Sequence, residues 1–313
     1  MKIATMDIGS GTVRVLMCRL EKGRYCTDQI KRRITRLADD FAGGRLHPVS
    51  LARTAAAARD LAREARSYGA VEIRAACTGV TRRATNAGEF LQALADDAGL
   101  DPVVIAGEFE AQLSAQGASS EAGLGDKPFV LIDIGGFSTE FAKIRGRDFA
   151  GAVSVEVGSV SLTDRHMKSD PPTPEQLAAC AADVQAALGA LDRLDGVASF
   201  GPPVGTAGTI TTLAAIHLKM ERYDPARLSG VVLTAPRIEE LLALLVSMPA
   251  ADRLSLPGLE KGREDLMPAG AIICREALQR LGAERLLVTE GGLLQGLALC
   301  PEWPPTEGRW LTP

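Results

Sequence analysis

The chain is poor in the residues that build metal centres from nitrogen and sulfur ligands. Its 313 residues include three histidines, which are scattered along the sequence and form no ligand spacing. The six cysteines form no C-x-x-C pair and no spacing that links them to a histidine. A structural zinc site is therefore not expected. We interpret the cysteines as reduced core residues of a cytoplasmic protein.

The sequence also lacks a long hydrophobic run and an excess of positive charge. Its longest apolar stretch, Leu241–Met248, is far too short to cross a bilayer, and no basic-then-apolar leader precedes the first expected strand. The net charge of −4 provides no general basic field for a polyanion. We therefore expect neither a membrane nor a nucleic-acid partner. Any anionic ligand must be held by a local cluster and by backbone dipoles.

Two similar glycine loops, roughly 125 residues apart, stand out against this background. They read Met6-Asp7-Ile8-Gly9-Ser10-Gly11-Thr12 and Ile132-Asp133-Ile134-Gly135-Gly136-Phe137-Ser138-Thr139-Glu140. Each follows an apolar run and suits a tight turn that brings backbone N–H groups up to phosphate oxygens. A single copy is more often a plain structural turn. Two copies, each opening one half of the chain, predict a duplicated fold with phosphate held between the halves.

These loops supply candidates for binding phosphate and metal. The phosphate-binding candidates are Gly9, Ser10, Gly11 and Thr12 in the first loop, and Gly135, Gly136, Phe137, Ser138 and Thr139 in the second. Asp133, with Asp7, can hold Mg²⁺ or Mn²⁺, because these ions prefer oxygen ligands. A third stretch, Gly205–Thr212, leads into an expected helix whose N-terminus could receive a phosphate through Gly208 and Thr209. Tight packing of helix on strand explains these glycines equally well.

The order of expected elements is that of an α/β protein. Each half begins with three strands and then alternates helix and strand, which predicts mixed sheets flanked by helices. We expect helices at Ser50–Tyr68 and Thr173–Leu194, capped by Ser50 and Thr173, and a strand at Val197–Phe200. The segment Gly123-Leu124-Gly125-Asp126 has the composition of a hinge. It predicts domains at residues 1–123 and 124–313.

Several stretches, taken together in their order and spacing, resemble a known family. Besides the two loops, these are Thr78–Asn86, Ile105–Ala111, Val157–Val160, Gly205–Thr212, Leu256–Leu259 with Arg263, and Thr289–Leu293. The chain from residue 3 to about residue 297 resembles the exopolyphosphatase/guanosine pentaphosphate phosphohydrolase (Ppx/GppA) family in its short two-domain form. This family lies within the acetate kinase/sugar kinase/heat-shock-protein-70/actin superfamily. The resemblance implies two ribonuclease-H-like domains with the site in the interdomain cleft, and a homodimer.

The resemblance also assigns roles to acidic and basic side chains. Locally, Glu108 and Glu110 are two acids in the first turn of an expected helix, where they could merely complement its dipole. The resemblance implies that Glu110, directly before alanine, is the catalytic base that orients water. It implies that Glu140 is catalytic and binds metal, against the alternative of a solvated strand residue. It also favours Arg82 over its neighbour Arg83 as a phosphate ligand.

Two features leave alternatives open. The basic run Lys31-Arg32-Arg33 with Arg36 is either a solvated face or a secondary contact for a long polyanion. Phe137 stands where the family usually has a third glycine. If the backbone there needs a positive φ, the bulky side chain costs on the order of 1 kcal/mol or more and crowds the phosphate.

These observations lead to one preferred function and three rivals. The preferred one is an exopolyphosphatase, which hydrolyses the terminal phosphoanhydride of inorganic polyphosphate with the help of Mg²⁺ or Mn²⁺. The first rival is removal of the 5′-phosphate of guanosine pentaphosphate (pppGpp). The second is a kinase that uses ATP, for which no aspartate base facing a sugar or acid is found. The third is a non-catalytic regulator that binds (p)ppGpp or polyphosphate.

Overall fold

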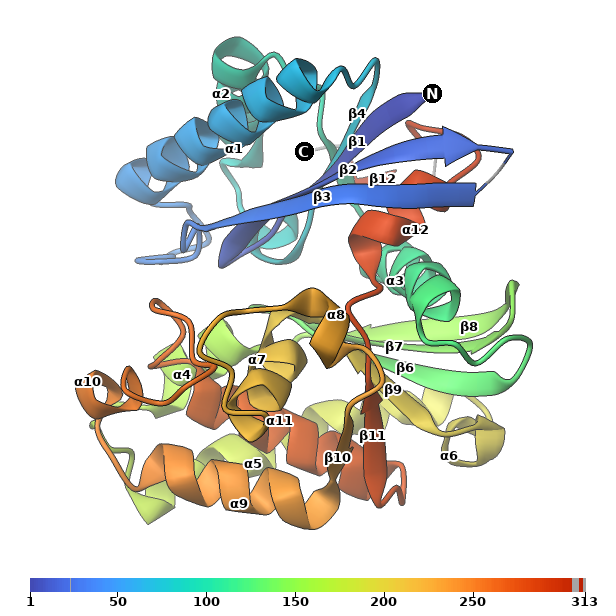
Figure 1. Cartoon of the computed structure of the whole chain (residues 1–313). Helices are drawn as coiled ribbons and strands as arrows, with labels where there is room; N and C mark the ends of the chain where they lie inside the picture. Colours follow the sequence, from blue (N-terminus) through green and yellow to red (C-terminus); the bar gives the residue numbers. More distant parts are fainter. Residues whose placement is uncertain (23, 306–309, 312–313) are drawn as a thin grey trace. The chain divides into compact units, whose positions relative to one another are not determined.

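The computed structural model describes residues 1–22, 24–305 and 310–311 (Figure 1). The polypeptide forms two compact units. One comprises Met1–Gly117 with Leu293–Pro313, and the other comprises Ala118–Gly292. The first boundary falls inside helix α3 (Gly107–Glu121) and therefore precedes the glycine-rich segment chosen from the sequence.

The first unit contains a mixed sheet with the strand order β12-β5-β4-β1-β2-β3. Three strands form an antiparallel meander, namely β1 (Lys2–Ile8), β2 (Thr12–Glu21) and β3 (Arg24–Ile34). Parallel to β1 run β4 (Ile73–Cys77) and β5 (Val103–Ile105), and β12 (Trp310–Leu311) pairs antiparallel with β5. β1 is buried from Ile3 onward, because helices cover both faces of the sheet.

Helices α1 (Pro48–Tyr68) and α2 (Ala87–Ala98) lie on one face of this sheet, and α3 and α12 (Leu293–Leu299) lie on the other (Figure 1). Leu294 and Ala298 of α12 pack against apolar side chains of β1 and β2. The hydroxyl of Thr5 donates to the carbonyl of Leu294 at 2.8 Å. The buried guanidinium of Arg74 donates to the carbonyls of Leu297 and Cys300 at 2.9 and 2.7 Å. These contacts return the C-terminal segment to the first unit, which differs from the single boundary predicted between residues 123 and 124.

The second unit repeats the arrangement with the strand order β10-β11-β9-β6-β7-β8. The antiparallel meander consists of β6 (Pro128–Ile134), β7 (Thr139–Arg145) and β8 (Asp148–Val155). Parallel to β6 run β9 (Pro203–Thr206) and β11 (Arg285–Val288), and β10 (Val232–Thr234) closes the edge antiparallel to β11. The duplicated mixed sheets flanked by helices confirm the predicted fold class.

The helices of the second unit pack around α11 (Met267–Arg280), which contributes many side chains to a continuous apolar core. Its neighbours are α4 (Ser159–His166), α5 (Pro174–Leu188), α7 (Ala207–His217) and α9 (Ala235–Val246). Shorter helices are α6 (Val197–Phe200), α8 (Pro225–Leu228) and α10 (Ala250–Arg253), and 3₁₀ helices span Gly79–Arg83 and Gly189–Arg193. The alternate side chains of β6, Val130, Ile132 and Ile134, belong to this core. Leu131 and Asp133 therefore leave the opposite face of the sheet.

Three local predictions can be compared with these elements. Thr173 caps α5 as expected, since its hydroxyl accepts a hydrogen bond from the N–H of Gln176, but the α-helix ends at Leu188. The predicted cap of α1 is wrong, because the helix begins at Pro48 and its N-cap is His47, whose Nδ1 accepts a hydrogen bond from the N–H of Val49 at 3.3 Å. The predicted strand at Val197–Phe200 is wrong, because this segment is helix α6. The strand starts at Pro203, after Gly201 has passed so close to β6 that a Cβ would lie 2.2 Å from the carbonyl oxygen of Pro128.

The end of helix α7 carries a histidine that accepts a hydrogen bond as a neutral ring. The Nε of Arg237 donates to the Nδ1 of His217 at 2.9 Å. Burial, together with the charge of Arg237, lowers the pKa of His217 below its ordinary value of 6.5. As the pH falls, His217 is therefore protonated in the unfolded chain before it is protonated in the folded protein. The free energy of unfolding decreases as the pH falls below 6.5, and it stops decreasing once the pH is below the lower pKa of the folded state.

We expect His217→Gln to flatten the loss of thermal stability between pH 7 and pH 5. Glutamine keeps an oxygen that can accept from Arg237 but takes up no proton in this range. Melting temperatures of the wild type and the variant, measured across this range, check the expectation. Parallel pH profiles would contradict it.

Candidate functional site

The first glycine loop is a tight hairpin turn between β1 and β2. The N–H of Gly9 donates to the carbonyl of Thr12 at 3.1 Å and closes the turn. The hydroxyl of Ser10 accepts a hydrogen bond from the N–H of Val80 at 2.8 Å. Val80 lies in the 3₁₀ helix that also carries Arg82. The loop and the candidate arginine therefore belong to one connected local structure.

The second glycine loop is closed in the same way, by the N–H of Gly135 donating to the carbonyl of Ser138 at 3.0 Å. The first turn of α4 then binds the carbonyl groups of the loop. The N–H of Ser159 donates to Gly135 at 3.0 Å, and that of Val160 donates to Gly136 at 2.8 Å. A trans peptide places its C=O and N–H on opposite sides. The N–H groups that follow these carbonyls in the loop therefore point away from α4.

A corresponding segment secures the first loop. The N–H groups of Thr35 and Arg36 both donate to the carbonyl of Gly11 at 2.9 Å, and that of Ala38 donates to Ser10 at 3.0 Å. In each unit, the segment after the third strand thus holds the loop carbonyls on one side. The following N–H groups face the other side, as a turn that receives an anion requires.

Phe137 fits this geometry without the strain that its position suggested. Among the described residues, the non-glycine positions with positive φ are Lys22, Arg36, Asp40, Ala207 and Lys219, and Phe137 is not one of them. Its side chain is 6% exposed, so the ring packs into the protein. The departure from glycine is therefore accommodated by the fold.

Acidic and hydroxyl side chains form a row across the second sheet, beside its glycine loop. Asp133 on β6 stands directly opposite Glu140 on β7, which places both side chains on the same face. Ser154 on β8 stands opposite Glu140, and its hydroxyl donates to Glu140 Oε1 at 2.8 Å. Thr206 on β9 flanks Asp133 on its other side. Both carboxylates are buried, with Glu140 at 0% exposure.

In the first unit, the position equivalent to Glu140 is occupied by a basic residue, Arg14. Asp7 stands opposite Arg14, whose Nη2 donates to Asp7 Oδ2 at 2.8 Å. The hydroxyl of Thr78 donates to Asp7 Oδ1 at 3.3 Å. Both carboxylate oxygens thus have protein partners, and the charge is balanced by a guanidinium. In this structure Asp7 is therefore the partner of Arg14, and its role in holding a metal stays a prediction.

Asp133 and Glu140, in contrast, fit a divalent cation. Their donor set consists of oxygen only, which is what Mg²⁺ and Mn²⁺ favour. Two adjacent buried carboxylates need a compensating positive charge. Within residues 1–22, 24–305 and 310–311 there is no group of three or more His, Cys, Asp or Glu arranged to hold a metal. The ion would therefore complete its coordination with water or with substrate oxygens, as Mg²⁺ commonly does.

Glu110 and Arg82 are brought together in the first unit. Glu110 lies in the first turn of α3, where its N–H donates to the carbonyl of Ala106 at 2.9 Å. Its carboxylate forms an ion pair with the guanidinium of Arg82, and both side chains are only about one-tenth exposed (11% and 12%). Arg83 is exposed to solvent instead. The pair joins the candidate base to the arginine that the sequence favoured.

The predicted third stretch is also a turn at the carboxyl end of a strand, between β9 and α7. Ala207 there has a φ of 67°, an unfavourable backbone conformation for a residue with a Cβ, and such strain is enriched at functional sites. The guanidinium of Arg263 covers Gly208 so closely that a Cβ would meet its Nη1 at 2.3 Å. Thr209 packs against Gly270 of α11. These contacts explain the glycine by close packing and bring a cationic side chain to this turn.

Sequence reasoning missed three of the partners described here. No local sequence pattern marked Arg14 or Ser154, because the partner of each is a carboxylate on the neighbouring strand. Arg263 belonged to a stretch that carried the resemblance, but nothing in its own neighbourhood indicated a contact with Gly208.

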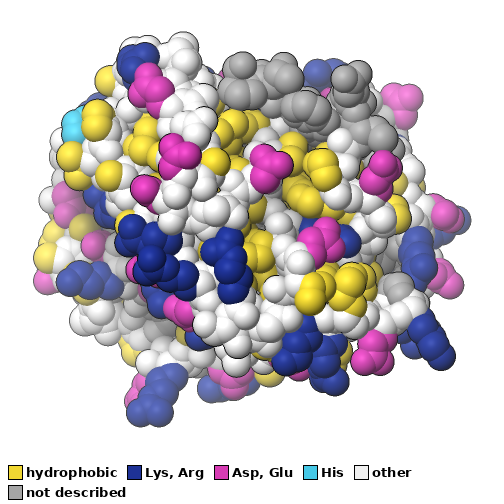
Figure 2. Space-filling view, turned by 90° about the horizontal axis from the view of Figure 1, so that it is seen from above, with side chains coloured by type: hydrophobic (Ala, Val, Ile, Leu, Met, Phe, Trp, Pro, Cys, Tyr) yellow, Lys and Arg dark blue, Asp and Glu magenta, His cyan; other side chains and the backbone are white. Residues whose placement is uncertain are grey.

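The basic run on β3 is largely balanced by acidic side chains. Lys31 and Arg33 both form ion pairs with Glu64 of α1, and Arg36 pairs with Asp39. On the face shown in Figure 2, basic and acidic side chains are interspersed and do not form one continuous basic field. These contacts favour the solvated-face interpretation of the run over a contact for a polyanion.

Comparisons with known proteins identify the family of the chain. The model of the Ppx/GppA phosphatase family matches residues 27–300. The chain belongs to the Ppx/GppA phosphatase family. The exopolyphosphatase 2 of Mycobacterium tuberculosis is 32% identical over 312 residues, which cover 95% of this chain and 98% of the relative. The Ppx/GppA enzyme of Aquifex aeolicus has a TM-score of 0.79 and 28% identity over 96% of this chain and 99% of its own.

A further relative extends the range of substrates within the family. The guanosine-5′-triphosphate,3′-diphosphate pyrophosphatase of Aeromonas salmonicida is 27% identical over 94% of this chain and 58% of its own length. The resemblance stated from the sequence and the expected enzyme class, a hydrolase of phosphoanhydride bonds, are thereby confirmed. Among the residues that the structure describes, none of the helices is long and apolar enough to cross a membrane. The expected cytoplasmic location, homodimer and interdomain cleft stay predictions.

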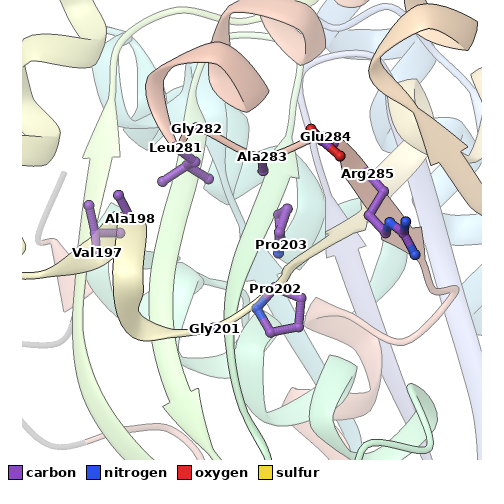
Figure 3. Close-up of a pocket in the computed structure, with 10 residues that line it drawn as sticks. All are labelled: Val197, Ala198, Gly201, Pro202, Pro203, Leu281, Gly282, Ala283, Glu284 and Arg285. Atoms are coloured by element: carbon purple, nitrogen blue, oxygen red, sulfur yellow. The ribbon is translucent and has the colours of Figure 1, made fainter.

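A cavity of about 290 Å³ lies at the end of the second sheet where the parallel strands β9 and β11 begin (Figure 3). It is lined by Val197 and Ala198 of α6, by Pro202 and the first residue of β9, Pro203, and by the turn that leads into β11. This is where the parallel strands begin, whereas the glycine loops of this Ppx/GppA protein lie where strands end. The cavity is therefore separate from the candidate site.

We expect Gly158→Ala to disrupt the second glycine loop. A Cβ at Gly158 would lie 2.3 Å from the carbonyl carbon of Gly136, so either the loop or α4 must shift. The cost should be about 1–3 kcal/mol of unfolding free energy or more, measured by urea denaturation. The matched control is Gly189→Ala, since a Cβ there has no neighbour within 4 Å. Equal stabilities of the two variants would contradict this account of the loop.

Proposed function

We propose that this Ppx/GppA protein is an exopolyphosphatase. It would cleave the terminal phosphoanhydride of inorganic polyphosphate with water, releasing orthophosphate and a chain one phosphate shorter. The similarity to exopolyphosphatase 2 along nearly the whole of both chains supports this substrate. The observation that carries the proposal is the buried ion pair between Glu110 and Arg82, connected to the first glycine loop through Ser10 and Val80.

In this mechanism, Glu110 orients the attacking water and accepts its proton. A general base must lie within hydrogen-bonding reach of the proton that it takes, directly or through one water. Arg82 keeps the carboxylate in place. We propose that its guanidinium, which carries five N–H donors in a planar fork, also contacts phosphate oxygens of the substrate. As negative charge develops on the transferred phosphoryl group, Arg82 and the N–H groups of the glycine loops stabilise it.

The second unit would hold the cation and further phosphate oxygens. Asp133 and Glu140 are the proposed ligands of Mg²⁺ or Mn²⁺, which when bound offsets the charge of the phosphate groups. The N–H groups of the second loop, turned away from α4, are placed to donate to phosphate oxygens. Gly208 and Thr209, with Arg263 beside them, are proposed to contact a more distant phosphate.

Hydrolysis of the 5′-phosphoanhydride of guanosine pentaphosphate is the second candidate. It is favoured by the similarity to the Aeromonas pyrophosphatase, and it uses the same base and the same loops. A non-catalytic regulator that binds either ligand is the third. Assays of phosphate release distinguish the three.

We expect phosphate release from polyphosphate to exceed release from guanosine pentaphosphate and from ATP, and to stop when EDTA removes divalent cations. Restoring Mg²⁺ or Mn²⁺ should restore the reaction, because the paired carboxylates need a cation before a polyanion can approach. Faster release from guanosine pentaphosphate would replace the first candidate by the second. Binding of either ligand without any release would favour the regulator.

Glu110→Gln should lower kcat by about 100-fold or more, since a general base usually contributes this much. Glu108→Gln is the matched control, because it makes the same change at an exposed position in the same helical turn. It should retain activity near that of the wild type. If Glu110→Gln keeps kcat within about tenfold of the wild type, Glu110 is not the base. Urea denaturation of both variants separates a loss of chemistry from a loss of folding.

A further inference from the structure

We propose that Ser154 is a positioning residue that holds the Glu140 carboxylate in the orientation required for binding the divalent cation. This inference rests on the proposed function, because it takes Glu140 as a metal ligand. It adds a residue that the sequence did not single out and gives the outer strand β8 a part in the site.

The geometry of the sheet places Ser154 where it can act in this way. Ser154 and Glu140 are direct cross-strand partners on β8 and β7, so their side chains leave the same face side by side. The hydroxyl donates to Glu140 Oε1 at 2.8 Å, a length typical of a well-formed bond to a carboxylate. Asp133, on β6, lies on the other side of Glu140. The hydrogen bond therefore fixes one oxygen of Glu140 on the side away from Asp133.

Burial gives this hydrogen bond its importance. Glu140 is 0% exposed, so its carboxylate cannot be oriented by bulk water and depends on protein donors. Ser154 is half-buried at the sheet margin and contributes only a small side chain to packing. Ser154→Ala thus removes a hydrogen-bond donor from the buried Glu140 carboxylate and leaves the apolar core of the unit almost unaltered.

The comparison with the first unit points the same way. There the residue opposite Asp7 is Arg14, which supplies positive charge directly. In the second unit the residue opposite Asp133 is itself an acid, and a hydroxyl on the next strand orients it. Partners that orient a ligand are needed where a metal provides the positive charge, and their loss commonly weakens metal affinity by about 10- to 100-fold.

The test is a titration of the purified full-length protein with Mn²⁺, following binding by calorimetry in the absence of substrate. Ser154→Ala should raise the dissociation constant by about tenfold or more, and Ser154→Thr, which keeps the hydroxyl, should stay within about threefold of the wild type. Ser199→Ala is the control, because this exposed hydroxyl donates to the carbonyl of Gly196 in its own helical turn and lies outside the candidate site. The half-saturating Mn²⁺ concentration for phosphate release should shift in parallel.

Glu140→Gln separates the two levels of the proposal. If it abolishes Mn²⁺ binding while Ser154→Ala binds as the wild type does, the positioning role of Ser154 is overturned and the proposed function stands. If Glu140→Gln leaves Mn²⁺ binding unchanged, Glu140 is not a ligand, and the role of Ser154 falls with it. Equal weakening by Ser154→Ala and Ser154→Thr would also overturn the proposal, because the hydroxyl would then not be the cause. Melting curves without metal confirm that each variant is folded.

Discussion

Carboxylates buried where strands end need a compensating positive charge, and the two units meet this need in different ways. In the first unit, Asp7 is balanced by Arg14 across the strands, and Glu110 by Arg82 from a neighbouring 3₁₀ helix. In the second unit, the position equivalent to Arg14 is occupied by an acid, which faces Asp133. A sheet of the same topology thus carries an internal ion pair in one unit and, in the other, the two carboxylates that we propose as cation ligands. We accordingly propose that the first unit activates water and that the second unit binds the metal.

The backbone around the glycine loops is, in contrast, alike in the two units. In each, amide groups of the segment that follows the third strand bind loop carbonyls, so that the next N–H groups face the opposite direction. The N-terminus of α4 is consequently occupied by its own loop and does not serve as a separate anion site. The dipole of the helix acts through the loop that it holds. Sequence variation such as Phe137 is tolerated, because what matters is the direction of the peptide groups.

Much of the fold could be predicted from the sequence. The repeated aspartate–glycine loops, each followed by a pair of strands and alternating elements, were sufficient for a duplicated α/β fold with mixed sheets. The placement of Glu110 in the first turn of a helix was equally local. Errors arose where a distant segment decides the local conformation. Val197–Phe200 is a helical turn, and the strand begins only after Gly201 has passed close to β6. The helix α12 joins the first unit because Arg74 and apolar side chains of β1 and β2 bind it.

The sequence by itself determined which short segments turn, which residues can accept a proton or bind phosphate, and that the pattern occurs twice. These properties depend on neighbours within a few positions along the chain. Only the tertiary structure decided that Asp7 meets an arginine, that Glu140 meets Asp133 and Ser154, and that Arg263 covers Gly208. Such partners are set by strand register and helix packing between residues far apart in sequence. The charge balance of a buried site depends on these neighbours, so it cannot be read from the order of residues alone.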